Sequence, residues 1–359
     1  VMFRLAELHF EAAVDEYNRA DEAYQLALER YELGIDAVAP TEPRKDFGRT
    51  SALFTDLIRR FPDYRQVDGA RYLLGICYEQ DERYDEALAQ YRYITEHHTD
   101  SMFAQEAHLR MGEYFFEEVR FQDAREQYLA AMDYGQTKWW DKILFKLGWS
   151  YYLLAQYEQA ISTFTQLLYF YAEGDREGSA ALRQEAMQYF AISLSEVDWN
   201  SDGVVDAEFI MGRVERFLGA DSTYASETLD RLASVLSENQ SHDESIEVNE
   251  YAIRRFDCDP RNVERALMIV ESLGKIRNFD RALEMQRLLA TNFGPGSSWY
   301  ACQEREGNEE AMTRAEQVVK ENLVETAARY YLAAERAMLD AEESGSAQQL
   351  EDARQQFDY

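Results

Sequence analysis

Apolar residues recur along this chain at the spacing of amphipathic helices, and the arrangement repeats about every 36 residues. One copy starts with Leu74 and Gly75, has an aromatic residue at Tyr78, and continues with Ala87 and Tyr91. Two further copies keep the same order: Met111, Gly112, Phe115, Ala124 and Tyr128, and then Leu147, Gly148, Tyr151, Ala160 and Phe164. Because each half of a copy has apolar positions three and four residues apart, each copy predicts two helices joined by a turn.

The small residues at fixed positions indicate how the two helices of a copy pack. A glycine such as Gly75 lets the second helix approach closely, and an alanine such as Ala87 stands where a larger side chain would push the helices apart. One helical hairpin cannot bury its apolar face alone, so consecutive hairpins must stack. The sequence therefore predicts an all-α solenoid of about six to seven helix–turn–helix hairpins, stacked as a right-handed superhelix.

The third copy resembles the tetratricopeptide repeat (TPR). The residues that match the pattern of that family are Leu147, Gly148, Tyr151, Ala160 and Phe164. The leading Trp of the pattern is replaced by Leu144 here, and by Arg71 and His108 in the two preceding copies. The period exceeds that of the family by two or three residues, which implies longer turns between repeats. The resemblance implies a stacked TPR-like fold whose work is to hold other proteins.

Weaker copies of the pattern extend it in both directions. We expect five regions: a long helix and irregular first repeat at 1–67, well-formed repeats at 68–197, an Asp-rich loop insertion at 198–209, degenerate repeats at 210–296, and C-terminal helices with a truncated repeat at 297–359. Segments 3–33 and 309–342 are predicted to be long helices, and Pro40 and Pro43 to lie in an insertion between two helices. Since the chain begins and ends within helical patterns, we expect it to be part of a longer protein.

Several segments give a closer resemblance. They are RLAEL at 4–8, FPDY at 61–64, YLLGICY at 72–78, MGEYFFE at 111–117 and KLGWSYYLLAQYEQAISTF at 146–164. They look like segments of large envelope TPR proteins of gliding and predatory Gram-negative bacteria, which are similar to the TPR lipoproteins of outer-membrane β-barrel assembly and of the Tol–Pal system. The resemblance implies a periplasmic or outer-membrane-associated scaffold in motility or outer-membrane organisation. The alternatives are a cytoplasmic TPR adaptor and a passive structural spacer without a specific peptide groove.

The composition narrows the choice of partner. A formal net charge of −31 would repel nucleic acid and anionic lipid surfaces, so we expect neither as a partner. The charge fits either a salt-adapted or GC-rich host or an acidic face that recruits a basic protein. No apolar stretch reaches the length of a transmembrane helix, so we expect no direct membrane insertion by this chain.

Continuing the repeat register predicts the positions that line a groove along the first helices of the hairpins. The predicted groove residues are Tyr72, Glu113, Phe116, Phe145, Trp149 and Tyr152. Aromatic side chains give large contact areas, and the carboxylates beside them favour a basic protein or peptide with apolar anchors. The alternative is that these aromatic residues belong to the core or are covered by another helix.

An Asp-rich segment resembles the first nine residues of an EF-hand loop. Its possible calcium ligands are Asp198, Asn200, Asp202, Val204 and Asp206. The Glu expected at position 12 is absent, because Phe209 stands there and Glu208 comes one residue early. The segment predicts either a weak Ca²⁺ site or a polar turn without metal.

No motif marks a catalytic centre. The three cysteines, Cys77, Cys258 and Cys302, are far apart and contain no CxxC, so the sequence indicates neither a zinc site nor a disulfide framework. Cys77 lies in an apolar run and is expected to be a small buried residue. No phosphate-binding loop, nucleophile elbow or HExxH motif occurs. We therefore expect a non-enzymatic protein that requires no cofactor, with Ca²⁺ as the one possible ligand.

Overall fold

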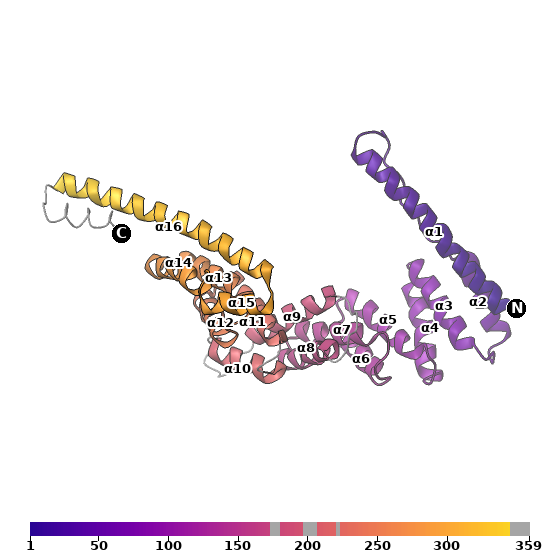
Figure 1. The fold of residues 1–359 in the computed structure, drawn as a ribbon. Helices are drawn as coiled ribbons and strands as arrows, with labels where there is room; N and C mark the ends of the chain where they lie inside the picture. Colours follow the sequence, from indigo (N-terminus) through magenta and orange to yellow (C-terminus); the bar gives the residue numbers. More distant parts are fainter. Residues whose placement is uncertain (173–179, 197–206, 220–222, 345–359) are drawn as a thin grey trace. The chain divides into compact units, whose positions relative to one another are not determined.

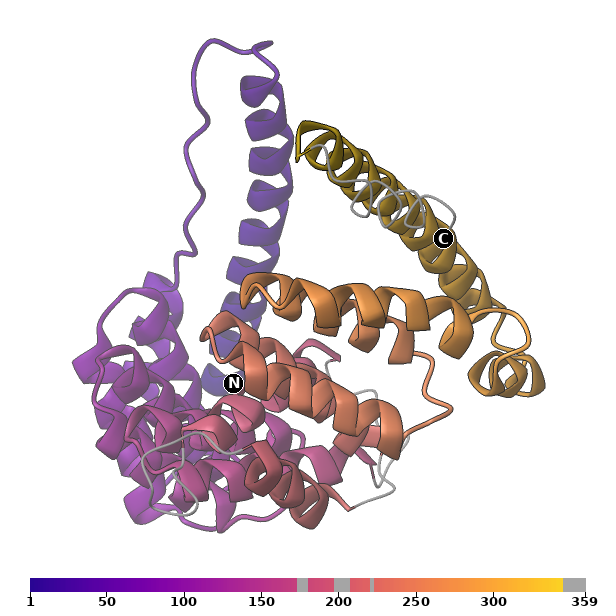
Figure 2. The same cartoon turned by 90° about the vertical axis from the view of Figure 1, so that its left-hand side faces the viewer.

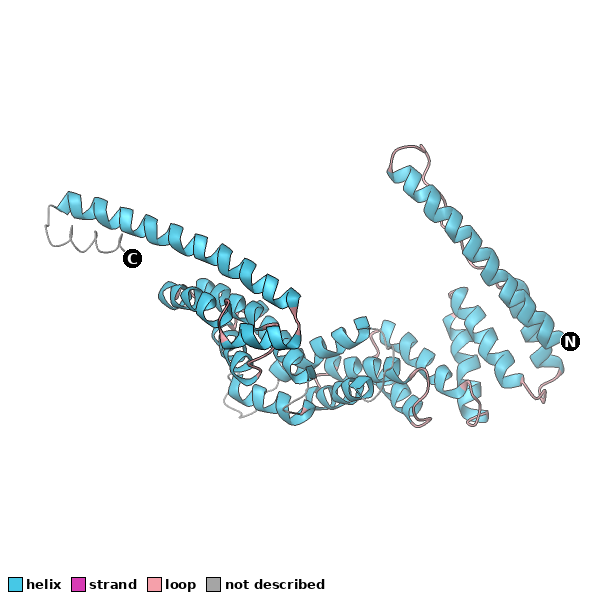
Figure 3. Cartoon of the chain, viewed as in Figure 1, coloured by secondary structure: helices cyan, strands magenta, loops and turns pink. Residues whose placement is uncertain are grey.

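A computed structural model describes residues 1–172, 180–196, 207–219 and 223–344. The described residues form sixteen α-helices and no strand (Figures 1 and 3). The helices are α1 Met2–Glu32, α2 Gly48–Arg60, α3 Val67–Gln80, α4 Tyr84–His97, α5 Ala104–Glu117, α6 Phe121–Met132, α7 Trp140–Leu153, α8 Tyr157–Ala172, α9 Ala180–Ser195, α10 Ala207–Leu218, α11 Thr223–Glu238, α12 His242–Arg255, α13 Asn262–Lys275, α14 Phe279–Phe293, α15 Ser298–Glu306 and α16 Glu309–Ser344.

Neighbouring helices pack on each other in sequence order, as the repeat predicts. In the N-terminal part α3 packs on α4 and α5 on α6, and in the C-terminal part α11 packs on α12 and α13 on α14. The chain forms two compact units, residues 1–163 (unit 1) and 164–359 (unit 2). The predicted all-α, TPR-like fold of helical hairpins is confirmed.

The close approach predicted at the glycines is present in unit 1. A Cβ atom on Gly75 would lie 2.5 Å from Cε1 of Tyr91, and one on Gly112 would lie 2.5 Å from Cε1 of Tyr128. Each tyrosine comes from the second helix of the hairpin and is buried. The glycines therefore make room for an aromatic ring, which fixes the distance between the two helices.

The turns within the hairpins share one backbone conformation. A non-glycine residue with positive φ stands in each of five turns: Glu82 (59°), Val119 (60°), Ala155 (55°), Gln240 (66°) and Arg277 (61°). The residue five positions later is the first buried residue of the second helix, and its side chain is always small. These residues are Ala87, Ala124, Ala160, Ser245 and Ala282. The weaker copies at 232–289 thus keep the geometry of the strong ones.

The first hairpin differs in its connection. Figure 2 shows α1 extending from unit 1 with the segment 33–47 returning alongside it. The rings of Phe10 and Phe47 stack at 4.9 Å, and Lys45 Nζ lies 4.8 Å from the ring centroid of Tyr17. The predicted long helix, the insertion with Pro40 and Pro43, and the long helix near the C-terminus are all observed.

The cysteine prediction was wrong for one pair. Cys258, in the turn between α12 and α13, forms a disulfide with Cys302 of α15, with the two Cα atoms 5.8 Å apart. Two hydrogen bonds join the same elements: Gln303 Nε2 donates to the Cys258 carbonyl at 2.7 Å, and Trp299 Nε1 donates to the Asp259 carbonyl at 2.8 Å. The two cysteines are 44 positions apart in the sequence and leave no spacing signature, so the packing of α15 is what reveals the pair. Cys77 is buried, as expected.

A buried charge cluster lies beside the disulfide in unit 2. Arg265 is 2% exposed and pairs through Nε with Asp230 at 2.5 Å and through Nη2 with Asp259 at 3.4 Å. Its Nη2 also donates to the hydroxyl of Ser226 at 2.7 Å, and Arg261 adds a second pair with Asp259 at 2.6 Å. The cluster ties α11, the α12–α13 turn and α13 together.

Candidate partner-binding surface

The first helices of the hairpins in unit 1 carry all six predicted groove residues. Tyr72 lies on α3, Glu113 and Phe116 lie on α5, and the remaining three lie on α7. The ring of Trp149 contacts two others of the six, with centroids 5.0 Å from Phe116 and 5.8 Å from Phe145. Tyr72 stands apart and stacks on Phe103 at 4.8 Å.

Burial separates the six residues. Tyr72 (7% exposed) and Phe145 (4%) have their side chains in the interior, where they support the helices. Phe116, Trp149 and Tyr152 are half-buried, and Tyr152 packs on Tyr157 at 5.9 Å between ring centroids. The accessible aromatic area therefore comes from α5 and α7.

Two lysines on α7 complete the surface. Lys146 Nζ lies 4.8 Å from the ring centroid of Phe116 and 5.3 Å from that of Trp149, and Lys142 Nζ forms an ion pair with Glu113 at 2.6 Å. We call Glu113, Phe116, Lys142, Lys146, Trp149 and Tyr152 the α5–α7 surface. Each lysine stands three residues before an aromatic residue of the same helix, Phe145 or Trp149, and this spacing was the signal available in the sequence.

An ion-pair network holds α3 against α5 beside this surface. Arg110 donates to Glu79 at 2.9 Å and to Glu106 at 3.1 Å, and its guanidinium lies 5.7 Å from the ring of Tyr72. Burial raises the pKa of the Glu79 carboxyl, although Arg110 opposes that shift. Because the Arg110 guanidinium pairs with Glu79 of α3 and with Glu106 of its own helix, it ties α5, which presents part of the surface, to α3.

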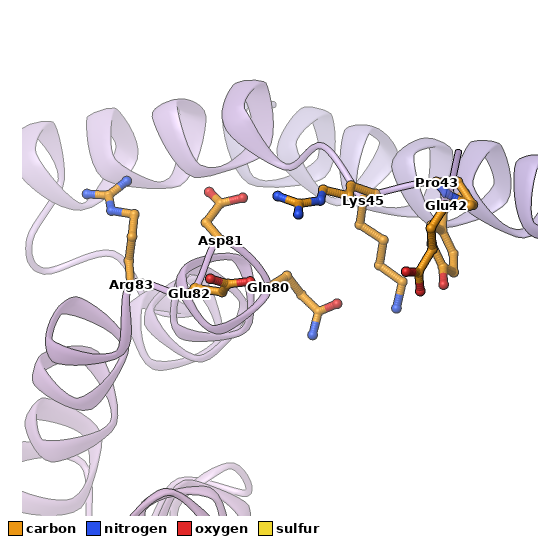
Figure 4. A pocket seen from close by; sticks show the side chains of 9 residues that line it. Glu42, Pro43, Lys45, Gln80, Asp81, Glu82 and Arg83 are labelled. Carbon is orange, nitrogen blue, oxygen red and sulfur yellow. The ribbon is translucent and has the colours of Figure 1, made fainter. Parts of the chain in front are cut away.

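Another pocket of unit 1 lies away from the α5–α7 surface. It has a volume of about 660 Å³ and is formed by α1, the segment after it and the α3–α4 turn (Figure 4). Its lining residues are Tyr17, Glu42, Pro43, Arg44, Lys45, Gln80, Asp81, Glu82 and Arg83. Figure 4 shows cations and carboxylates at both ends of this open pocket, so it has no single charge preference.

The predicted calcium ligands, residues 198–206, lie outside the described residues. Among the residues that the structure describes, no group of three or more His, Cys, Asp or Glu side chains could hold a metal ion. In the same ranges, no helix combines the length and the hydropathy needed to cross a membrane.

The comparison with known families agrees with this architecture over one helical hairpin. The sequence model of the tetratricopeptide repeat family matches residues 143–173, which contain most of α7 and α8. No curated protein matches the chain. Three solved structures are similar to it at low identity.

The first is the C-terminal part of a TPR repeat-containing protein from Cytophaga hutchinsonii (16% identity, 79% of this chain and 98% of that chain, TM-score 0.36). The second is pilF of Pseudomonas aeruginosa (13% identity, 81% and 99%, TM-score 0.31). The third is a Rap protein complexed with competence and sporulation factor (13% identity, 95% and 98%, TM-score 0.31). The chain thus carries a tetratricopeptide repeat, and the first helix of that repeat, α7, supplies four residues of the α5–α7 surface.

Proposed function

We propose that this chain is a non-enzymatic scaffold that holds another protein on its α5–α7 surface. The observation that carries the proposal is the half-buried cluster of Phe116, Trp149 and Lys146, whose rings and ammonium are already packed in place. Pre-organised aromatic side chains bind with little loss of side-chain entropy and are enriched among the residues that dominate interface energies. TPR units generally bind proteins and do not catalyse reactions.

The partner is a protein or peptide with apolar anchors and basic residues. Its apolar anchor packs on Phe116 and Trp149, while its basic residues are attracted by the net charge of −31. The same charge disfavours nucleic acid and anionic lipid as partners.

The proposed compartment is the periplasm or the periplasmic side of the outer membrane, within an assembly for motility or outer-membrane organisation. The Cys258–Cys302 disulfide supports this location, because such bonds persist in oxidising compartments and are rare in the cytoplasm. The test is thiol labelling of the chain in its own cells after fractionation. Labelling of Cys258 and Cys302 without prior reduction, in a cytoplasmic fraction, would favour the cytoplasmic adaptor.

Calcium is proposed for the segment 198–206 on the sequence pattern alone. Without the Glu at position 12, binding is expected only at about millimolar Ca²⁺. Calorimetry with the wild-type chain should show heat that Asp202→Ala abolishes, and a chain that gives no heat at millimolar Ca²⁺ has no such site.

The binding proposal is tested by capture of proteins from a cell-envelope extract. Trp149→Ala together with Tyr152→Ala should lower the amount of captured protein at least about tenfold. Tyr31→Ala, which removes an exposed aromatic from α1, is the matched control and should change nothing. Unchanged capture by the double variant would favour the passive spacer.

A further inference from the structure

A second, smaller pocket adjoins the α5–α7 surface and has no role so far. It has a volume of about 270 Å³ and lies where α3 and α5 end and α4 begins. Its lining includes the carboxylates of Glu79, Glu113 and Glu117 and the rings of Tyr84 and Tyr114. Because Glu113 belongs to both, the pocket is continuous with the α5–α7 surface, and we call it the Tyr84 pocket.

The charges of the Tyr84 pocket are not balanced within the described part of the chain. Arg110, the cation in its lining, is engaged by Glu79 and Glu106, and Lys142 pairs with Glu113. Glu117 is exposed and forms no ion pair with any described residue. The last turns of α3 and α5 both border the pocket. The negative ends of these two helix dipoles therefore make the electrostatic potential around Glu117 more negative.

The two tyrosine rings suit a planar cation. Their centroids lie 5.5 Å apart, Tyr84 is 40% exposed, and no described Lys or Arg lies over either ring. Guanidinium groups stack on rings elsewhere in unit 1: Arg71 on Tyr93 at 3.5 Å, Arg83 on Tyr78 at 4.3 Å and Arg120 on Phe115 at 4.5 Å. Arginine can stack on a ring and pair with a carboxylate at once, which an ammonium does less well.

Tyr128 of α6 is buried within the electrostatic range of two of these carboxylates, Glu113 and Glu117. Tyr128 is 0% exposed, and its hydroxyl has no hydrogen-bond partner among the described residues. Its ring packs against α5 at Gly112, with Cζ 2.9 Å from where a Cβ would stand. Burial raises the pKa of Tyr128, and these two carboxylates add to the shift. The negative charge around Glu113 and Glu117 thus extends into the α5–α6 packing, although Tyr128 is not part of the pocket lining.

We propose that the Tyr84 pocket receives one arginine side chain of the protein held on the α5–α7 surface. The guanidinium stacks on Tyr84 and donates two hydrogen bonds to Glu117, while an apolar residue of the same partner contacts Phe116 and Trp149. This inference rests on the proposed function and adds to it the residue that the partner must supply.

The test uses a random-peptide library selected for binding to the full chain. The selected peptides should be enriched in arginine, and replacing that arginine by citrulline, which has the same shape without the charge, should weaken binding about tenfold. Glu117→Gln should cause a similar loss, and the citrulline peptide should then bind the variant and the wild type equally. Glu118→Gln, an exposed neighbour outside the pocket lining, is the matched control and should bind like the wild type.

Different outcomes separate this inference from the proposed function. In one outcome, the peptides bind the Trp149→Ala chain more weakly than the wild type, but neither Glu117→Gln in the chain nor citrulline in the peptide lowers the affinity. This outcome would overturn the arginine pocket and leave the α5–α7 surface as the binding site. A library that yields no peptide, or only peptides indifferent to Trp149→Ala, would contradict both. Tyr84→Leu is a second variant, and it should abolish the preference for arginine over lysine without changing the helical circular dichroism.

Discussion

Single residues decide how closely the helices of a hairpin pack. Gly75 and Gly112 each face a buried tyrosine ring at a distance that leaves no room for a methyl group. The same pair of positions therefore sets the packing of the hairpin.

Gly112→Ala should destabilise unit 1 by about 1–2 kcal/mol, because overpacking against Tyr128 outweighs the better helix propensity of alanine. Gly274→Ala is the matched control, since no atom lies within 4 Å of its added Cβ, and it should be neutral or stabilising. Chemical denaturation of the two variants gives the comparison. Equal behaviour would show that the glycine–tyrosine contact does not set the helix spacing.

The charge cluster around Arg265 should make unit 2 sensitive to acid. Burial alone would raise the pKa of Asp259, but a hydrogen bond from Arg261 and the charge of Arg265 outweigh it and hold the pKa well below its usual range. A lowered pKa stabilises the fold above the unfolded value of about 4, and this contribution is lost as the pH falls further.

Asp259→Asn should therefore cost about 2 kcal/mol at pH 7, and the difference from the wild type should shrink below pH of about 4. Thermal unfolding at several pH values measures it. A difference that stays constant across this range would mean that the ionised carboxylate of Asp259 does not stabilise unit 2.

At the scale of elements, the hairpin turns repeat more faithfully than the sequence does. Positive φ recurs at Glu82, Val119, Ala155, Gln240 and Arg277, although these five residues share no chemistry. The strain is greatest for Val119, since a β-branched side chain crowds the backbone in the left-handed region. The turn geometry is therefore imposed by the packing of the helices on either side.

Val119→Asn should stabilise unit 1 by about 1 kcal/mol, because asparagine tolerates this conformation better. The control is Val324→Asn, at a similarly exposed position within α16, which should gain no stability. Unfolding midpoints of both variants test this. A gain at position 324 but not at 119 would contradict strain in the turn.

How far the sequence predicts these features depends on the range of the interactions. The hairpins were predictable, because Gly75, Ala87 and Tyr91 lie within one repeat and their spacing is local. The disulfide of Cys258 joins residues 44 positions apart, and the ion pair of Arg265 with Asp230 joins residues 35 positions apart, with no spacing rule to reveal either.

The surface was predictable in part for the same reason. The repeat register identified Phe116 and Trp149 as residues of one face, but a register does not predict how deeply a side chain is buried. Tyr72 and Phe145 occupy equivalent positions and are buried, since Phe103 covers the first and the Trp149 ring packs on the second.

At the scale of the whole molecule, the chain combines packed helical units with a strongly negative charge. Unit 1 presents the α5–α7 surface and the Tyr84 pocket on consecutive first helices, and unit 2 is held by a disulfide and buried ion pairs. Under the proposed function, the negative charge raises the rate at which a basic partner is encountered, while the aromatic cluster slows its release. Such a division of roles is typical of a binding scaffold.

The affinity of the purified captured partner for this chain tests the account most directly. Calorimetry should give a dissociation constant at least about tenfold higher for Trp149→Ala than for the wild type, and an unchanged constant for Tyr31→Ala. Equal affinities of Trp149→Ala and the wild type would contradict the claim that the α5–α7 surface holds the partner.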